Sequence, residues 1–199
     1  MDNKFNINAD FTKYMELFLE QNSKLNLISK NDEKVLFEKH VYDSLAIKLT
    51  NKLKDGISIL DIGCGGGFPC VPIAIEYPNV NVIGIDSIRK KINAINSIKE
   101  SLNLDNLTTI CDRVEKLNGQ KFDIVTGRAV ASLDKIAEYA LPLLKKDGFF
   151  IAYKSKKVIE ELQDAKNVLS KYKAKVLDII EYTLPLDEPY ERNLIVIGF

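Results

Sequence analysis

The sequence has few of the residues that mark secreted, membrane or metal-binding proteins. Its three cysteines, Cys64, Cys70 and Cys111, are odd in number and lack C-x-x-C spacing, which indicates neither a disulfide framework nor a zinc ribbon. No apolar run approaches the roughly 18–20 residues that a membrane span requires, and no basic leader precedes an apolar run. We therefore expect a cytoplasmic protein without a metal site or a membrane partner.

A net charge of either sign is also missing. The chain has 28 basic and 28 acidic residues, which disfavours a protein that holds nucleic acid by bulk electrostatics alone. The average conceals an excess of lysine over acidic residues within residues 145–175. A lysine-rich helix is usually a solvated face, and a surface facing a polyanion is the alternative.

The chain lacks internal repeats, low-complexity tracts and Gly/Ser linkers. Its 199 residues, of which 46% are hydrophobic, suffice for one sizeable core but not for two full domains. We therefore expect a single domain over residues 1–199, in which a helical segment at 1–55 packs on a core at 56–199.

Hydrophobic periodicity divides the chain into helical and strand-like segments. Helical patterns cover residues 10–25 and roughly 32–50. Short apolar runs at 57–62, 80–86, 107–112, 122–127 and 148–154 then alternate with helical patterns near 69–77, 89–103, 132–145 and 156–172. This alternation predicts a parallel sheet with helices on both faces. The last two runs, 174–184 and 192–199, are joined by a loop, which favours antiparallel neighbours.

A glycine-rich turn, "DIGCGGGFPC", follows the first strand-like run. It contains Gly63, Gly65, Gly66 and Gly67. Open parallel sheets bind ligands beyond the carboxyl ends of their strands. The dinucleotide fingerprint would need a glycine where Phe68 stands, and Phe68 followed by Pro69 makes a poor cradle for a pyrophosphate. Asp86, which ends the second run, can accept both ribose hydroxyls of an adenosyl or a nicotinamide cofactor.

Glycines 63, 65 and 67 after one strand and an acid after the next resemble the class I S-adenosylmethionine-dependent methyltransferases. The polar turn at 112–115 would then lie beside the adenine end of the cofactor. Two other readings of these residues stay open: an NAD-dependent oxidoreductase, and an adenosyl sensor without catalysis.

Eight segments extend the resemblance to one family, the ribosomal RNA small subunit methyltransferase G family, also called glucose-inhibited division protein B. They are "QNSKLNLIS" (21–29), "KHVYDSL" (39–45), "LDIGCGGGFPCVPIAI" (60–75), "IDSIRKKINAI" (85–95), "LNLDNLTTICDRVEKL" (102–117), "GRAVASL" (127–133), "YKS" (153–155) and "ERNLIVI" (191–197). The resemblance implies a doubly wound, seven-stranded, mostly parallel sheet whose last strand is antiparallel, preceded by N-terminal helices. It also implies methyl transfer from S-adenosylmethionine to N7 of a guanine in 16S ribosomal RNA, which the family name gives as guanine 527.

The resemblance further implies particular site residues. For the cofactor these are Gly63, Phe68, Val114, Glu115 and Arg128, to which the fold pattern adds Gly65 and Asp86. Arg128, Lys154 and Arg192 are the candidates for contact with RNA, with a solvated surface role as the alternative for the last two. The implied partner is 16S ribosomal RNA or the 30S particle, and we expect a monomer.

The residues that this chemistry does not need are also missing. Guanine N7 has an in-plane lone pair and no proton, so positioning suffices without a general base. The place after the fourth run, where base amino-group methyltransferases have an Asn/Asp/Ser-Pro-Pro-aromatic loop, reads "TGRAVASL". We expect a structural role for His40, the single histidine, and a packing role for Cys70. The near-zero net charge leaves open a small-molecule or protein substrate.

Overall fold

Helical turns of several kinds make up the first part of the protein in the computed structural model, which describes residues 5–117, 119–155 and 158–199. Helix α1 (Thr12–Leu25) ends where Asn26 adopts a left-handed φ of 51°. It is followed by α2 (Lys30–Glu33), the π-helix η1 (Phe37–Val41), α3 (Tyr42–Leu45) and the 3₁₀ helix η2 (Ala46–Thr50). The helical pattern expected over roughly 32–50 is therefore observed as a series of short helices, in which π and 3₁₀ turns interrupt the α-helical hydrogen bonding.

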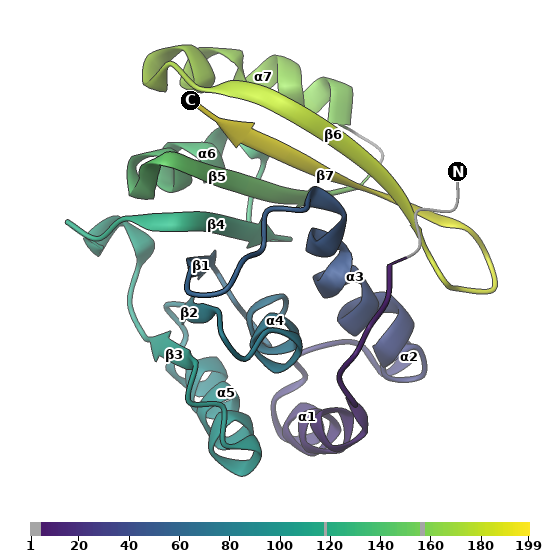
Figure 1. The fold of residues 1–199 in the computed structure, drawn as a ribbon. Helices are drawn as coiled ribbons and strands as arrows, with labels where there is room; N and C mark the ends of the chain where they lie inside the picture. The colour runs from purple at the N-terminus through teal and green to yellow at the C-terminus, as the bar shows by residue number, and fades with distance from the viewer. Residues whose placement is uncertain (1–4, 118, 156–157) are drawn as a thin grey trace.

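Strands and helices alternate after this segment, as the sequence predicts. The elements are β1 (Ser58–Ile62), α4 (Cys70–Glu76), β2 (Asn81–Ile85), α5 (Arg89–Leu102), β3 (Leu107–Ile110), η3 (Val114–Lys116), β4 (Phe122–Arg128), α6 (Leu133–Ala140), η4 (Leu141–Leu143), β5 (Leu144–Lys154), α7 (Val158–Tyr172), β6 (Lys175–Leu184) and β7 (Tyr190–Gly198). The strands form one seven-stranded sheet in the order β3-β2-β1-β4-β5-β7-β6 (Figure 1).

The direction of the strands agrees with the prediction for the end of the chain. Strands β1 to β5 pair in parallel, whereas β7 lies antiparallel to both β5 and β6. The interior strand β1 is buried over residues 59–62, which is typical of a parallel strand covered on both faces. The predicted mostly parallel sheet with an antiparallel last strand is confirmed.

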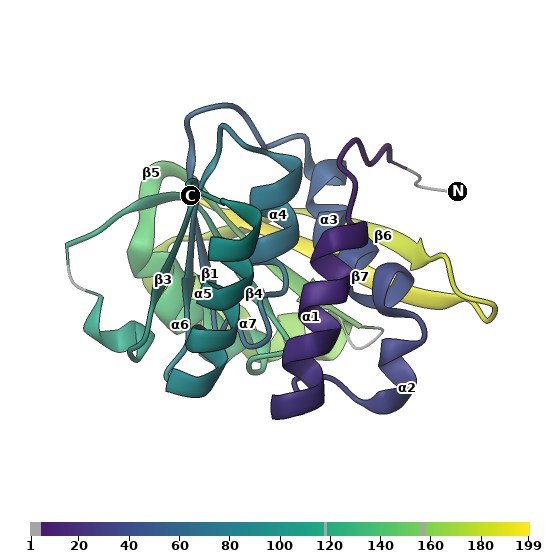
Figure 2. The same ribbon diagram turned by 90° about the horizontal axis from the view of Figure 1, so that it is seen from below.

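Two apolar clusters lie on opposite faces of the sheet. One joins α1, α4 and α5 to the sheet and includes Phe18, Ile73 and Ile95; these helices lie in front of the sheet in Figure 2. The other joins α6 and α7 to the opposite face. The segment before α1 is tied to this framework because the Glu76 carboxylate accepts hydrogen bonds from the Asn8 and Ala9 backbone at 3.0 and 2.9 Å.

Two predicted helices have different bounds in the structure. The helix expected over 132–145 ends at Ala140, and Leu144 already pairs with Phe122 in the sheet. Pro142 has no backbone N–H and cannot continue an α-helix, so the chain passes through η4 into β5. The helix expected at 156–172 is observed as α7, and its first two residues, Lys156 and Lys157, lie outside the described residues.

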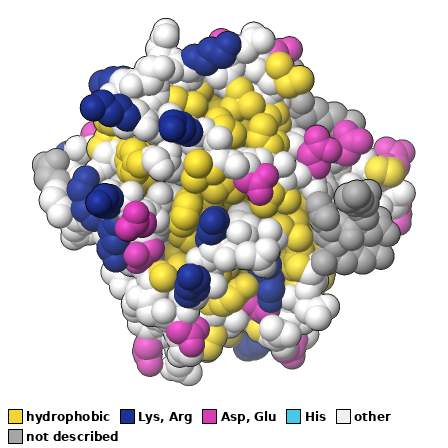
Figure 3. All heavy atoms as spheres, turned by 45° about the horizontal axis from the view of Figure 1, so that its top comes forward, with side chains coloured by type: hydrophobic (Ala, Val, Ile, Leu, Met, Phe, Trp, Pro, Cys, Tyr) yellow, Lys and Arg dark blue, Asp and Glu magenta, His cyan; other side chains and the backbone are white. Residues whose placement is uncertain are grey.

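Lys145 and Lys171, two lysines of the basic region at 145–175, are exposed, whereas Lys154 is buried. Figure 3 shows the basic side chains of one face lying among acidic and apolar ones. Exposed lysines of this region pair with carboxylates, Lys145 with Asp123 at 2.7 Å and Lys171 with Glu138. These pairs fit the interpretation of a solvated face. None of the helices in the described ranges is both long and apolar enough to cross a bilayer.

Candidate functional site

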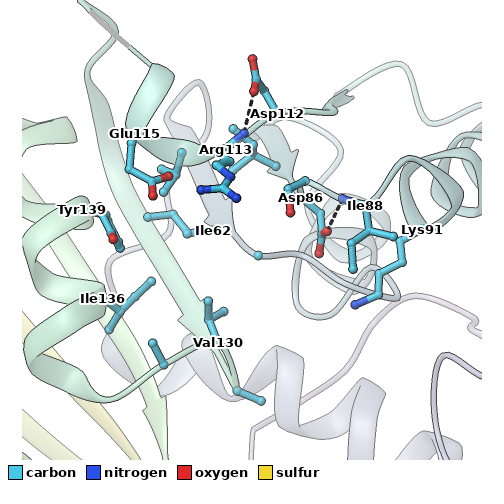
Figure 4. Close-up of a pocket in the computed structure, with 16 residues that line it drawn as sticks. Ile62, Asp86, Ile88, Lys91, Asp112, Arg113, Glu115, Val130, Ile136 and Tyr139 are labelled. Atoms are coloured by element: carbon cyan, nitrogen blue, oxygen red, sulfur yellow. Dashed lines mark hydrogen bonds between the residues drawn. The ribbon is translucent and has the colours of Figure 1, made fainter.

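The carboxyl ends of β1, β2 and β4 and the turn after β3 border one cavity of about 440 Å³ (Figure 4). It is lined by Ile62, Gly63, Ile85, Asp86, Ser87, Ile88, Lys91, Asp112, Arg113, Val114, Glu115, Ala129, Val130, Ala131, Ile136 and Tyr139. Its position agrees with the rule that open parallel sheets bind ligands beyond their carboxyl ends. Three acidic and two basic side chains line it, a balance that disfavours a pyrophosphate ligand.

Gly63, the first residue of the glycine loop after β1, lines this cavity. Gly63, Gly65 and Gly67 have φ values of +65°, +55° and +98°. Residues other than glycine rarely adopt such positive values. A Cβ at Gly63 would lie 2.7 Å from Cγ2 of Val130. The close approach of Val130 therefore requires a residue without a Cβ at position 63.

Asp86 connects the glycine loop to the end of β2. Its Oδ2 accepts a hydrogen bond from the Gly65 backbone at 3.0 Å and its Oδ1 accepts one from Ile88 at 2.8 Å. The carboxylate is thereby held in one orientation at the cavity wall. Each of its oxygens keeps a second lone pair for a ligand hydroxyl.

Of the seven predicted cofactor residues, the structure brings four together at the cavity wall. These are Gly63, Asp86 and, from the 3₁₀ turn η3, Val114 and Glu115. Gly65, Phe68 and Arg128 are outside the lining. Gly65 acts on the cavity through its hydrogen bond to Asp86.

Phe68 lies behind the glycine loop, in an aromatic cluster with the N-terminal helices. Its ring centroid is 4.9 Å from that of Phe18 and 5.0 Å from that of His40. The guanidinium of Arg128 lies 5.5 Å from the Phe68 centroid, within the range of a cation–π interaction. Phe68 and Arg128 therefore support the loop and the end of β4 from the side of the helical segment.

Asp43 is the acidic centre of a buried network on this side. Nε of Arg128 lies 2.9 Å from its Oδ2, and Nε of Arg192 and the Tyr182 hydroxyl donate to its Oδ1 at 3.1 and 2.6 Å. Burial raises the pKa of Asp43, but Arg128 and Arg192 outweigh that effect and hold the pKa below its usual value. The network thereby joins α3 to β4, β6 and β7.

Lys154, at the end of β5, is also engaged by the protein. Its Nζ donates to the carbonyl of Ala131 at 2.9 Å and lies 2.5 Å from Oε2 of Glu161. Only 10% of its side chain is exposed. Arg192, with 13% of its side chain exposed, is bound to Asp43. Contacts of these two residues with RNA stay predictions.

Cys70, for which the sequence predicts a packing role, and Asp61 are both fully buried. The backbone N–H of Cys70 donates to Asp61 at 3.2 Å. Burial raises the pKa of Asp61 to about 7, although hydrogen bonds from Thr126 and Cys70 oppose this. No group of three or more potential metal ligands occurs in the described ranges.

The family model described as rRNA small subunit methyltransferase G matches residues 7–194. The chain belongs to this family. Relatives in the family include the ribosomal RNA small subunit methyltransferase G of Staphylococcus saprophyticus, which is 42% identical over 191 residues, and that of Lachnoclostridium phytofermentans, 41% identical over 192. Each alignment covers 94% of this chain and about four fifths of the relative, 80% and 79% respectively.

Solved structures that share the fold are more distant in sequence than these family members. Magnesium protoporphyrin IX methyltransferase from Synechocystis, with bound SAH, has a TM-score of 0.64 at 16% identity and covers 94% of this chain and 99% of its own. TYW2 from M. jannaschii, in complex with AdoMet, has a TM-score of 0.58 at 16% identity, covering 77% and 74%. These likenesses confirm the predicted class I methyltransferase fold.

Sequence reasoning missed several cavity residues that this member of the family presents. Lys91 contributes a positive charge, Ile136 and Tyr139 come from α6, and Val130 follows β4, whereas Arg113 lies in the polar turn at 112–115 that the sequence predicts. The residues from strand ends could have been found by extending each strand prediction by three positions. The α6 residues carry a weaker signal, the i, i+3 spacing of an aliphatic and an aromatic side chain.

Proposed function

We propose that the protein transfers a methyl group from S-adenosylmethionine to N7 of guanine 527 in 16S ribosomal RNA. The observation that carries the proposal is the cavity at the glycine loop, in a chain that belongs to the rRNA small subunit methyltransferase G family. Family membership supports the coarser statement, methylation of ribosomal RNA with S-adenosylmethionine. The base and its N7 atom are the finer proposal.

The residues of the cavity fit an adenosyl cofactor. Asp86 offers carboxylate oxygens to the ribose hydroxyls, and Val114 lies at the place expected for adenine. The surplus of acidic over basic side chains in the lining suits a ligand that carries a sulfonium and an ammonium group, because opposite charges attract in a partly dry site. A pyrophosphate would meet repulsion there, which disfavours a nicotinamide dinucleotide.

We propose the seven predicted cofactor residues in two roles. Gly63, Asp86, Val114 and Glu115 contact the cofactor. Gly65, Phe68 and Arg128 hold the glycine loop and the end of β4 in the geometry that the contacts need, and their own bonds in the protein support this division.

The reaction requires no proton transfer by the protein. The N7 lone pair forms a bond to the methyl carbon, the carbon–sulfur bond breaks, and its electron pair stays on sulfur. S-adenosylmethionine supplies the activated methyl group, and the methylated guanine takes up the positive charge. The task of this chain is to bind and align the two reactants.

The target guanine must leave a regular helix to react. N7 lies in the deep, narrow major groove of A-form RNA, where side chains cannot reach it. We propose that the target is an unpaired or flipped-out guanine in a structured substrate, either 16S ribosomal RNA or the 30S particle. We further propose that the protein acts as a monomer in the cytoplasm. Arg128 and Arg192 stay our candidates for contact with RNA, whereas the bonds of Lys154 to Ala131 and Glu161 favour a positioning role.

Methyl transfer by the purified protein tests the proposal. The protein, tritiated S-adenosylmethionine and 30S particles that lack the modification are incubated, and labelled N7-methylguanosine is located by chemical cleavage at that base. Labelling of one guanine in 30S particles, with far less in a short single-stranded oligonucleotide, is expected. Equal labelling of both substrates, or label on another atom, would overturn the proposal.

A further inference from the structure

Residues 129–131, which directly follow β4, form one wall of the cavity and have an unusual backbone. Ala129 has a φ of +54° although it is not glycine, a conformation that costs energy and is concentrated at functional sites. The next side chain, Val130, is 43% exposed. The protein thus keeps a strained backbone that presents an apolar side chain to the cavity.

Both ends of this segment are fixed by ion pairs, one buried and one partly exposed. Before it, Arg128 is bound to Asp43 at 2.9 Å. After it, the carbonyl of Ala131 accepts a hydrogen bond from Lys154, whose partner Glu161 also accepts one from the Leu133 backbone at 2.8 Å. The segment is therefore held in place before any ligand arrives.

The segment lies at the end of the cavity where the methyl group has to be delivered. Strands β1 and β4 are neighbours, and Val130 covers Gly63. Asp86 and Val114, proposed for the ribose and adenine, follow β2 and β3 on the other side of β1. Figure 4 shows Val130 across the cavity from Asp112. The cavity end beside β4 is what remains for the reacting group.

Exposed apolar side chains gather around the same cavity. Ile88, Val130 and Tyr139 are 40%, 43% and 38% exposed, and all three line it. Apolar surface left open at a pocket marks a ligand site, and an extruded base has apolar faces that stack on such surface. Ile88 and Val130 offer no charge or hydrogen-bond donor that would favour binding of a phosphate group.

From these observations we infer that residues 129–131 are the platform for the target guanine, that Val130 contacts the base, and that Lys154 and Glu161 are positioning residues for this platform. The inference rests on the proposed function and names the part of the site that receives its substrate. It assigns Lys154 a role through Ala131, in place of a contact with RNA phosphate.

Truncation of Val130 tests the platform. For Val130→Ala we expect kcat/KM with 30S particles to fall about tenfold, a change of about 1.4 kcal/mol, while the Kd for S-adenosylhomocysteine stays within about twofold. Ile159→Ala, at a side chain 74% exposed and outside the cavity lining, is the matched control and leaves both unchanged. Unchanged activity in Val130→Ala, or a Kd that rises as much as activity falls, would overturn the inference.

Replacement of Lys154 separates positioning from phosphate contact. Lys154→Met is expected to lower kcat about tenfold or more, because small misplacements of reacting groups are costly, and Lys154→Arg to restore most of it. The slope of log Kd for 30S particles against log salt concentration stays unchanged. A slope reduced by about one, the sign of a lost phosphate contact, with kcat retained would overturn the positioning role.

Further variants keep the outcome decisive. Lys145→Met, which removes an exposed lysine paired with Asp123, is the charge-matched control. Glu161→Gln, at a side chain 23% exposed, repeats the test if Lys154→Met does not fold. A wild-type protein that methylates no ribosomal RNA overturns the proposed function and this inference with it, whereas an active wild type beside an unaffected Val130→Ala overturns the inference alone.

Discussion

A terminal guanidinium nitrogen of Arg128 lies 2.7 Å from Nδ1 of His40. Since a guanidinium can only donate, Nδ1 is the acceptor and carries no proton. Nε2 then carries the proton and faces Oδ2 of Asp32 at 3.3 Å. Both ring nitrogens are therefore engaged within the protein, and His40 has the structural role expected from the sequence rather than that of a general base.

The state of His40 predicts an acid-side loss of stability. Burial first, and Arg128 second, lower its pKa from 6.5 to about 4, so between these pH values the unfolded chain binds a proton that the folded chain does not. The neutral state of His40 therefore costs the folded protein no stability above pH 6.5. As the pH falls below that value, the free energy of unfolding decreases by up to about 1.4 kcal/mol per pH unit. Urea unfolding at pH 7 and at pH 5 measures this effect. Between these pH values we expect the free energy of unfolding to fall by about 2 kcal/mol more in the wild type than in His40→Asn.

The comparison with His40→Asn removes the effect of other groups. Asp61, with a pKa raised to about 7 by burial, has the opposite sign, since its contribution is lost as the pH rises toward 7. It is present in both proteins and cancels in the difference. A difference in unfolding free energy that does not change with pH would contradict the assignment for His40.

Two neighbouring glycines are expected to differ in their effect on cofactor binding. Gly63→Ala places a Cβ 2.7 Å from Val130, whereas at Gly65 the nearest atom is the Gly63 carbonyl oxygen at 3.7 Å. Both have positive φ, so the backbone strain is matched. Calorimetric titration with S-adenosylhomocysteine should show affinity about tenfold lower, about 1.4 kcal/mol, for Gly63→Ala and a smaller loss for Gly65→Ala. Equal losses of affinity in the two variants would contradict a specific requirement for glycine at position 63.

Removal of the Asp43 carboxylate is expected to be strongly destabilising. Asn in its place leaves Arg128 and Arg192 buried without the charge that compensates them, and breaking a buried pair in this way costs about 3–5 kcal/mol. Glu20→Gln, at an exposed residue paired with the exposed Lys24, is the control, and its cost is expected to be much smaller. Urea unfolding measures both. Similar small costs would show that the network contributes little.

Tyr14 offers a stabilising substitution. Its hydroxyl is buried and has no hydrogen-bond partner among the described residues, and an unsatisfied buried hydroxyl costs about 1–3 kcal/mol. Tyr14→Phe is therefore expected to raise the unfolding free energy by about 1 kcal/mol. Tyr153→Phe, which removes a hydroxyl bound to the Ser44 carbonyl at 2.7 Å, should lower it. Destabilisation by both would reveal a partner for Tyr14.

The sequence predicted the strands and the glycine loop well because these signals are local. The first four apolar runs end at, or directly before, a glycine or an acid, and the first turn after β1 carries its glycines within a few residues. The partners of the charged residues could not be predicted in this way. Asp43 and Arg192 are separated by 149 positions, and no periodicity links them.

The direction of the Arg128 side chain could not be predicted from its position in the sequence. Its place at the carboxyl end of β4 suggested a side chain in the cleft, and the structure turns the guanidinium toward Asp43 and His40 instead. The direction of one side chain depends on a partner from the N-terminal helices. That residues 1–199 form one domain, with 1–55 packed on 56–199, stays a prediction, supported by the apolar cluster that Phe18 and Ile73 share.

The most direct measurement is a map of N7-methylguanosine in 16S ribosomal RNA from cells with and without the gene for this chain. Chemical cleavage at methylated guanines followed by primer extension locates the modification. Loss of a single cleavage, at guanine 527, and its return when the gene is restored are the predicted result. An unchanged cleavage pattern in the deletion strain would contradict the proposed function.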